Sequence, residues 1–401
     1  MNVTERFLKY VSFPTTSSEN SDTVPTTQWQ KVLGEYLAAE LDNIGLENAH
    51  MDEYGYVYGY LPPTADCAAL EPLGLIAHMD TSPSVSGENI KPEIVSYTGG
   101  DLPLKSGVVM TVRDFPFLAE YAGQELIVTD GTTLLGADDK AGVAEIVTLC
   151  EYLKCNPSIS HRGIAVCFTP DEEVGSGADH FNFDTFPAHI AYTVDGGELG
   201  EIEYENFNAA AAEIHINGVN MHPGSAKNKM KNAVLLANEF ISAMPPAETP
   251  AHTEGYEGFY HIGGLRADET NAYISMIIRD HDMEKFTARK AFVANLVNYL
   301  NSVHGENTFE LDMHDSYYNM KEKIQPHIEL IDNAKAAMLS AGVTPHVVAI
   351  RGGTDGARLS YMGIPCPNLS TGGLNFHSIY EFIPVNALEK MVKVLENLVT
   401  A

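Results

Sequence analysis

The pattern of strands and helices that this sequence predicts changes twice along the chain. Before about residue 206, short apolar strands alternate with amphipathic helices, as in GLIAH, KAGVAEIVTLCEYL, GIAVCFTP and HIAYTV. Such alternation predicts an α/β sheet with helices packed on it. The same pattern returns after residue 317, but the elements predicted there have no partner layer of their own. We therefore expect residues 1–206 and 318–401 to form one α/β domain.

The segment between these two parts, residues 207–317, predicts a different unit. Its elements follow the order β-α-β-β-α-β, which is that of a compact ferredoxin-like fold. The first of its helices is predicted over NKMKNAVLLANEFISAM, with an apolar face made by Met230, Ala233, Val234, Ala237, Phe240 and Ile241. A second domain inserted into the first also fits a length of 401 residues, which exceeds what one core usually supports.

The charge of the chain excludes several kinds of partner. With 24 basic and 54 acidic residues, its formal net charge is −30, so neither nucleic acid nor an anionic membrane surface is an expected partner. No apolar run approaches the roughly 18 residues that span a bilayer, and the N-terminal MNVTERFLKYVSF lacks the apolar stretch of a signal peptide. We expect a cytoplasmic protein. Its five cysteines contain no C-x-x-C pair, which argues against a thiolate zinc site.

Residues able to bind metal or transfer protons follow several of the predicted strands. In GLIAHMDTSP, the side chains of His78 and Asp80 point to the same side of an extended backbone. This is the arrangement of a metal ligand and the carboxylate that orients it, although a plain hydrogen bond at a strand end is equally open. In TLLGADDKAG, Asp138 and Asp139 precede a helix, where they are either metal ligands or helix caps with Lys140 as counter-charge.

Further carboxylates and a second histidine complete the pattern. The loops FTPDEEVGSG and YTVDGG bring Glu172, Glu173 and Asp195 to the carboxyl ends of their strands, where open α/β sheets place their sites. Solvated acidic loops are the alternative. Together with His377 in GLNFHS, these ligands suit Zn²⁺, with Mn²⁺ or Co²⁺ as substitutes. Five ligands are too many for one open tetrahedral site, which favours two cations that share a carboxylate and acidify a bridging water. Glu172 or Glu173 would then be free to act as general base.

Five motifs, HMDTSP, LLGADDKAG, FTPDEEVGSG, YTVDGG and GLNFHS, occur in the order found in a known family. They resemble the dinuclear-zinc metallopeptidases that include aminoacylase and carboxypeptidase G, and the resemblance covers essentially the whole chain. It implies a mixed-sheet catalytic domain, an inserted lid or dimerisation-type domain, and two Zn²⁺ per chain. Within the family, the chain looks like the metallo-aminopeptidases that remove the N-terminal residue of tripeptides.

The resemblance also implies a role for each residue of the site. Asp138 would bridge the two metals, because the family pattern is Asp-x-Lys and Lys140 sets the register; a cis peptide bond is expected after it. Glu172 would be the general base, and Asp80 would orient His78. One metal would be held by His78, Asp138 and Asp195, and the other by Asp138, Glu173 and His377. An Asp at position 195, rather than Glu, tilts the choice of substrate toward peptides.

Three residues are candidates for contacts with the substrate. By the same resemblance, His222 in GVNMHPGSAKNKMKNA would stabilise the oxyanion, although it could simply shape its turn beside Pro223. Arg279 and Arg351 are scarce cations that could grip the C-terminal carboxylate of a peptide. For Arg279, a surface ion pair with a neighbouring aspartate is the alternative.

Two other functions remain open from the sequence. A related dizinc dipeptidase or N-acyl amino acid hydrolase would differ only in the dimensions of its pocket. A noncatalytic binding protein on the same scaffold is disfavoured because both Glu172 and Asp138 are present. The native metal, and whether the protein is a monomer or a homodimer, stay open as well.

Overall fold

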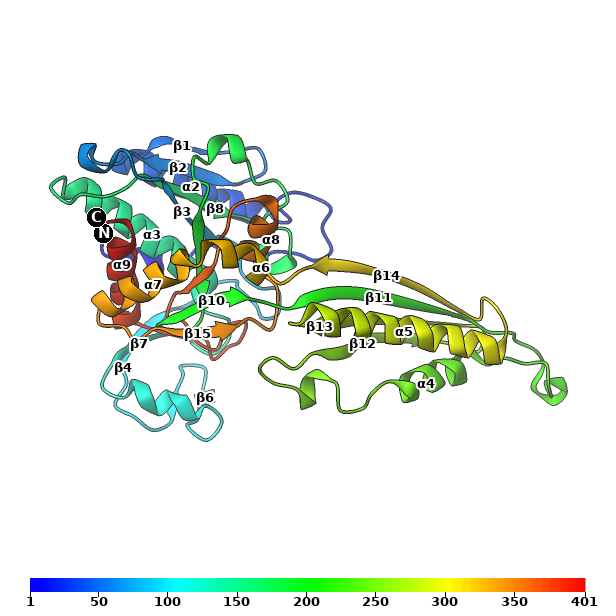
Figure 1. The fold of residues 1–401 in the computed structure, drawn as a ribbon. Coiled ribbons are helices and arrows are strands. Elements are labelled where there is room, and N and C mark those ends of the chain that lie inside the picture. The colour runs from blue at the N-terminus through cyan, green and yellow to red at the C-terminus, as the bar shows by residue number, and fades with distance from the viewer. Residues whose placement is uncertain (401) are drawn as a thin grey trace. The chain divides into compact units, whose positions relative to one another are not determined.

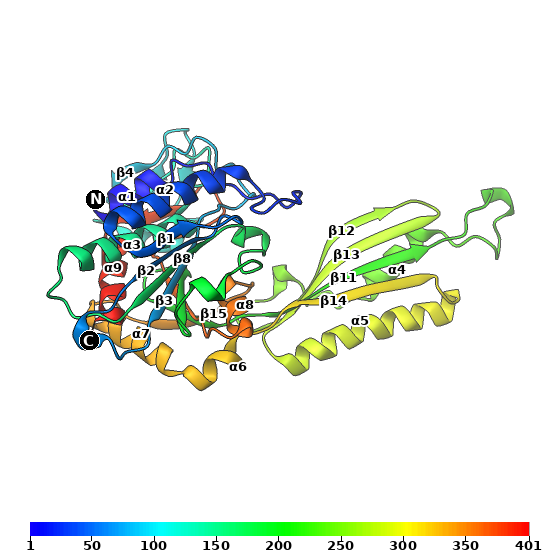
Figure 2. The ribbon, with the colours of Figure 1, turned by 90° about the horizontal axis from the view of Figure 1, so that it is seen from above.

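The computed structural model describes residues 1–400 and divides the chain into two compact units (Figures 1 and 2). Unit 1 comprises Met1–Tyr204, Met320–Val348 and the residues from Thr354 onward, and unit 2 comprises Glu205–Asn319 and Ala349–Gly353. The chain thus leaves unit 1 and returns to it. Among the described residues, no helix combines the length and the apolar character needed to cross a bilayer.

Unit 1 is built on an eight-stranded mixed sheet, in which β8, β3, β9 and β16 run parallel. Strand β2 pairs antiparallel with β1 and β8, and β10 pairs antiparallel with β16. Every residue of β3 and β8 is buried, which is typical of central strands covered on both faces. The sheet includes β15 and β16 from the C-terminal part, as predicted. In spatial order its strands are β1 (Glu47–Met51), β2 (Val57–Leu61), β8 (Ile164–Thr169), β3 (Leu73–His78), β9 (Ala191–Gly196), β16 (Asn368–Ser370), β10 (Glu201–Glu205) and β15 (His346–Ala349).

Helix α3 (Ala137–Cys155) packs on β3 and β9 and lies beside α9 (Val385–Val399), which in turn contacts α7 (Glu329–Ser340), as Figure 1 shows. The apolar residues that recur at helical spacing in α3 are all buried: Val143, Ile146, Val147, Cys150 and Leu153. Helix α1 (Val3–Tyr10) packs on α3, α2 (Gln28–Ile44) covers β1 and β2, and α6 (Lys321–Ile324) contacts α8 (Asp355–Met362).

Smaller elements complete unit 1. A three-stranded sheet has the order β17 (Phe382–Pro384), β7 (Glu125–Val128), β4 (Glu93–Ser96), and β5 (Leu102–Pro103) pairs with β6 (Val109–Met110). The short 3₁₀ helices of the chain span Ala65–Cys67, Pro116–Tyr121, Glu172–Val174, Phe183–Thr185, Pro223–Ser225, Pro250–His252 and Gln325–His327.

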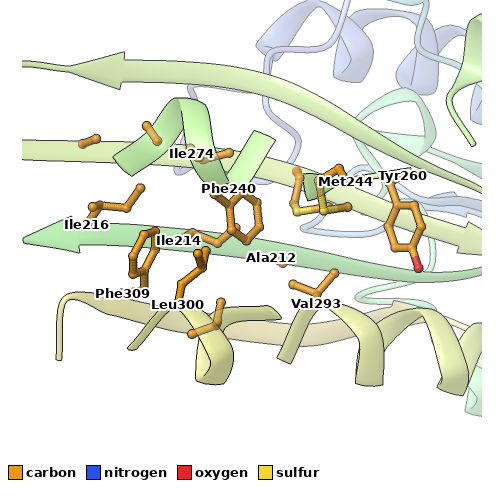
Figure 3. Packing of buried hydrophobic residues seen from close by; sticks show 14 of the residues in the cluster. Ala212, Ile214, Ile216, Phe240, Met244, Tyr260, Ile274, Val293, Leu300 and Phe309 are labelled. Carbon is orange, nitrogen blue, oxygen red and sulfur yellow. The ribbon is translucent and has the colours of Figure 1, made fainter. Parts of the chain in front are cut away.

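Unit 2 has the predicted order of elements: β11 (Asn208–Asn217), α4 (Ala233–Ala243), β12 (Phe259–Ala267), β13 (Asn271–Asp280), α5 (Met283–His304) and β14 (Phe309–Tyr317). Its antiparallel sheet, in the order β12-β13-β11-β14, has the ferredoxin-like arrangement. Apolar side chains of both helices pack on this sheet in a core of its own, in which Ile214, Phe240, Val293 and Leu300 are labelled in Figure 3.

Two sequence expectations for helices were wrong. Helix α4 begins at Ala233 rather than near residue 228, because the Asn232 side chain accepts from the N–H groups of Val234 and Leu235, and Val219 pairs with Lys231 just before it. Met230 therefore lies outside the helix, and Val234 is exposed. The glycines of the segment RGGTDGARLS predict a loop, but the segment contains the start of α8, which is capped by the side chain of Thr354.

Candidate metal centre

The site begins at the carboxyl ends of two parallel strands. His78 is the last residue of β3, and Asp195 lies near the end of the adjacent β9. Nε2 of His78 is 3.2 Å from a carboxylate oxygen of Asp195. Nδ1 of the same ring is 3.1 Å from the Asp80 carbonyl oxygen and 3.3 Å from the Asp80 carboxylate. Because Nδ1 donates to Asp80, the lone pair of the neutral ring is on Nε2 and available as a ligand.

Asp138 lies between the two histidines, with one carboxylate oxygen toward each. Its Oδ1 is 2.8 Å from Nε2 of His78, and its Oδ2 is 3.0 Å from Nε2 of His377. His377 Nε2 is also 2.9 Å from Oε2 of Glu173. The structure therefore brings together all five residues that the sequence suggested as ligands: His78, Asp138, Glu173, Asp195 and His377.

The neighbouring Asp139 has a different environment from Asp138. Its carboxylate is fully buried and accepts from the backbone N–H groups of His78 and Gly142. It ties the end of β3 to the start of α3, while Asp138 faces both histidines. The peptide bond between these two aspartates is cis, as the family resemblance implied.

Two carboxylates fix the loop that follows β8. Asp80 accepts from the N–H groups of both Glu172 and Glu173, so it connects His78 to this loop. Asp171 is buried and accepts from the backbone and hydroxyl of Thr26 and from the amide of Gln30. These contacts set the directions in which the side chains of Glu172 and Glu173 leave the backbone.

The electrostatics of the cluster fit a bound cation. Burial and the neighbouring Asp138 carboxylate raise the pKa of Glu173 to about 7, and burial raises the pKa of Asp195 to about 6 against the opposing effect of His78. Crowded carboxylates of this kind are stabilised by positive charge. In addition, Oε1 of Glu173 is buried with no hydrogen-bond partner among the described residues. An oxygen- and nitrogen-rich donor set with an orphaned carboxylate oxygen is suited to a divalent cation.

Glu172 differs from Glu173 because its carboxylate makes no contact with either histidine within ion-pair distance. Burial, followed by the nearby Asp195 charge, raises its pKa well above the ordinary value. A buried carboxyl beside the ligands, but outside their set, has the environment of a group that accepts a proton during a reaction.

The remaining candidates lie in unit 2, and the structure gives each its local contacts. His222 is exposed, and its Nδ1 accepts from the N–H of Gly224 at 3.1 Å, so the neutral ring carries its proton on Nε2. Arg279 donates through one terminal nitrogen to the carbonyls of Ala210 and Ile278 and lies over the ring of Tyr317.

Arg351 is more fully engaged. Its two terminal nitrogens donate to the carbonyls of Gly255, Glu257 and Thr253 and to the hydroxyl of Thr253. Its guanidinium also lies over the rings of Phe207 and Phe259. Within unit 2, Arg351 therefore holds the loop at residues 253–257.

Sequence reasoning missed the residues that support the ligands. Glu381 accepts from four backbone N–H groups in the segment that ends at Asp138, and no spacing in the sequence signalled this. Asp171 was recognised only as part of an acidic loop. The sole available signal for Glu381 was a carboxylate inside the otherwise apolar run YEFIP.

An α/β sheet that directs two histidines and several buried carboxylates to one edge defines a metal-dependent hydrolase. Residues 126–401 match the family described as Peptidase family M20/M25/M40. The chain is also 54% identical over 396 residues to peptidase T of Halothermothrix orenii, covering 98% of this chain and 97% of the relative. The chain belongs to this peptidase family and is a metallopeptidase.

Two solved structures share its fold. The aminopeptidase PepT of Bacillus cereus superposes with a TM-score of 0.77 at 24% identity, covering 99% of this chain and 97% of the other. A tripeptidase of Staphylococcus aureus gives a TM-score of 0.77 at 21% identity, covering 99% and 96%. At these identities, the similarity establishes the fold alone.

Proposed function

We propose that this protein is a dinuclear metallo-aminopeptidase that releases the N-terminal residue of tripeptides. The observation that carries the proposal is the Asp138 carboxylate, which presents one oxygen to His78 and the other to His377. A carboxylate in this position can serve two cations at once. The high identity to a peptidase T supports the choice of substrate.

In this proposal, His78, Asp138 and Asp195 hold one metal, and Asp138, Glu173 and His377 hold the other. Two divalent cations, Zn²⁺ in the first place with Co²⁺ or Mn²⁺ as substitutes, would acidify a water molecule and polarise the peptide carbonyl when bound. Glu172 takes a proton from the attacking water and delivers it to the leaving amine. Its raised pKa suits a group that must both accept and donate the proton.

Unit 2 contributes residues that recognise the substrate. The Nε2–H of His222 is the donor offered to the carbonyl oxygen as negative charge develops there. Arg279 keeps Nε and one terminal nitrogen without a protein partner among the described residues, and these can grip a C-terminal carboxylate. Arg351 is the weaker candidate for this second role, because its terminal nitrogens already hold the loop at residues 253–257.

A series of peptides tests the proposal. The purified protein is incubated with di-, tri- and tetrapeptides of one composition and with an N-acetylated amino acid, each with and without chelator. Release of the N-terminal residue from the tripeptide, lost with chelator and restored by metal, is the expected result. Faster hydrolysis of the dipeptide or of the acylated amino acid would favour the related dipeptidase or N-acyl amino acid hydrolase.

The metal content is a separate measurement. Elemental analysis after saturation with zinc is expected to give two metals per chain, and one per chain would contradict a bridging Asp138. Location in the cytoplasm stays a prediction, and the sequence leaves the choice between a monomer and a homodimer open.

A further inference from the structure

Glu381 is a buried carboxylate that accepts hydrogen bonds from four successive backbone N–H groups. Its side chain is only 1% exposed. Its Oε2 is 2.7 Å from the nitrogen of Leu135 and 3.1 Å from that of Gly136, and its Oε1 is 2.6 Å from the nitrogen of Ala137 and 3.3 Å from that of Asp138. Hydrogen bonds to an ionised acceptor are stronger than neutral ones, so this side chain strongly constrains the segment.

The N–H groups of this segment need hydrogen-bond acceptors from outside the helix. The first N–H groups of a helix have no acceptor within the helix, and Ala137 is the first residue of α3. Moreover, the backbone at Asp138 and Asp139 is not helical, with φ and ψ of −85° and 104° and of −124° and 35°. Regular helical geometry therefore does not determine the direction of the Asp138 side chain, and Glu381 supplies hydrogen bonds to the backbone that carries it.

Glu381 also belongs to the segment that carries the second histidine. Leu374 and Phe382 exchange two backbone hydrogen bonds that close the loop containing His377. Phe382 then pairs with Val128 in the three-stranded sheet. One carboxylate thus connects the segment of the bridging aspartate to the loop of a histidine that faces it.

The charge of Glu381 has a buried counterpart. Lys140 is also fully buried, donates to the Phe13 carbonyl at 2.8 Å, and interacts favourably with the Glu381 carboxylate. Burial raises the pKa of Glu381 to about 7, while the backbone N–H groups of Gly136, Leu135 and Asp138 favour its ionised form.

We propose that Glu381 is a positioning residue that holds the Asp138 carboxylate between His78 and His377 before metal binds. This inference rests on the proposed dinuclear site. Glu381 contacts backbone and none of the groups that react, so its effect is on the affinity for metal. Removing an outer partner of a ligand typically lowers metal affinity about 10- to 100-fold.

The Glu381→Gln substitution tests this role, because the amide keeps the size of the side chain. In either orientation its NH₂ group faces one pair of the backbone donors, so two of the four hydrogen bonds are lost. Metal affinity is measured by competition with a chromogenic chelator, and the expected loss for E381Q is about 10- to 100-fold. At saturating metal, kcat should return toward the wild-type value with little change in KM, which a general loss of structure would not allow.

The matched control is Glu145→Gln. Glu145 is a fully buried glutamate on α3 whose carboxylate has no hydrogen-bond partner among the described residues. Its substitution changes a buried carboxyl group in the same helix without touching the segment of Asp138, so E145Q should bind metal as wild type does. If E381Q does not fold, Glu381→Asp replaces it, since the shorter side chain keeps the charge but cannot reach all four N–H groups.

The outcomes separate the two proposals. A wild-type protein that binds fewer than two metals contradicts the dinuclear function itself. A wild type that binds two metals, with a folded Glu381 variant of equal affinity, overturns the positioning role and leaves the function standing. An equal loss of affinity in E145Q would also overturn it, because the effect would then follow from replacing any buried carboxyl group of this region.

Discussion

Glu172 and Glu173 are adjacent in sequence but differ in what their carboxylates contact. Glu173 lies 2.9 Å from His377, whereas Glu172 has no ion-pair contact with either histidine of the site. Glu172→Gln should therefore keep both metals and lower kcat about 10²- to 10⁴-fold, because an amide cannot accept the proton of the water. Elemental analysis and turnover of a tripeptide check this. Glu173→Gln is the control and should lose metal instead; the reverse result would exchange the two roles.

Arg279 offers a second prediction at the scale of single residues. A charge-assisted pair with the C-terminal carboxylate is worth about 1.5–3 kcal/mol, which is roughly 10- to 100-fold in kcat/KM. The wild type should therefore prefer tripeptide acids over their amides by this factor, and Arg279→Ala should lose the preference. Arg351→Ala is the comparison, because its terminal nitrogens bind the loop at residues 253–257. If the wild type hydrolyses tripeptide amides and acids with equal kcat/KM, Arg279 does not bind the C-terminal carboxylate of the substrate.

How much of the site the sequence could predict depends on the kind of residue. Of the five proposed ligands, His78, Glu173 and Asp195 lie at or just after the ends of strands, where the pattern indicates them. Asp138 and His377 lie at the start of α3 and in a loop, and the motifs indicate them. The residues that support them were not predictable in this way. Glu381 accepts from backbone N–H groups more than 240 positions away in the sequence. Every residue type except proline has such an N–H group, so the sequence does not indicate which ones Glu381 binds. Asp171 likewise acts through Thr26 and Gln30, which only the folded chain brings near.

At the scale of elements, α3 contains an unusual internal group. Both carboxylate oxygens of Glu145 are buried without partners among the described residues, and burial raises its pKa well above the ordinary value. In the unfolded chain this group ionises near its normal pKa, whereas burial in the folded chain favours its protonated form. Its contribution to stability is therefore largest below the unfolded pKa and is lost as pH rises toward the folded pKa.

Glu145→Met, a change of similar size, should therefore raise the free energy of unfolding by about 1–3 kcal/mol, and by more at pH 8 than at pH 5. Urea unfolding of both proteins at the two pH values measures the difference. Glu151 on the same helix is the control: it pairs with Arg6, and its pKa is lowered. Glu151→Gln should lose stability by nearly the same amount at pH 5 and at pH 8, because the contribution of a carboxyl with a lowered pKa is fully present above its unfolded pKa. A gain for Glu145→Met that does not depend on pH would show that the buried carboxyl does not titrate as proposed.

Element boundaries were harder to predict than element types. The apolar period of α4 continues through Met230, yet the helix begins only where Asn232 caps it. At α8, the glycines of RGGTDG favoured a loop, but the Thr354 side chain accepts from the N–H of Gly356 and starts a helix. In both cases a single capping side chain decided the boundary, and the apolar period of the sequence does not show where such a cap lies.

At the scale of the whole molecule, the change of pattern near residues 207 and 317 indicated the inserted unit and its order of elements. Residues 349–353 differ from the sequence expectation, because they pack with unit 2. The N–H of Ile350 donates to the Glu205 carbonyl, and its carbonyl accepts from His281. These hydrogen bonds join segments that are far apart in the sequence, so the local sequence pattern does not predict them.

The two units have separate cores, and all five proposed metal ligands belong to unit 1. Metal should therefore stabilise only unit 1. At a free metal concentration of 100 times Kd, the gain is about 2.7 kcal/mol per site. Calorimetry with and without chelator should show two unfolding transitions, one of which moves with metal. Phe240→Ala, in the core of unit 2 (Figure 3), should lower the other transition by about 3–5 kcal/mol in stability. A single transition that responds equally to chelator and to Phe240→Ala would mean that the units unfold as one, because ligand binding then stabilises every part of a cooperative structure.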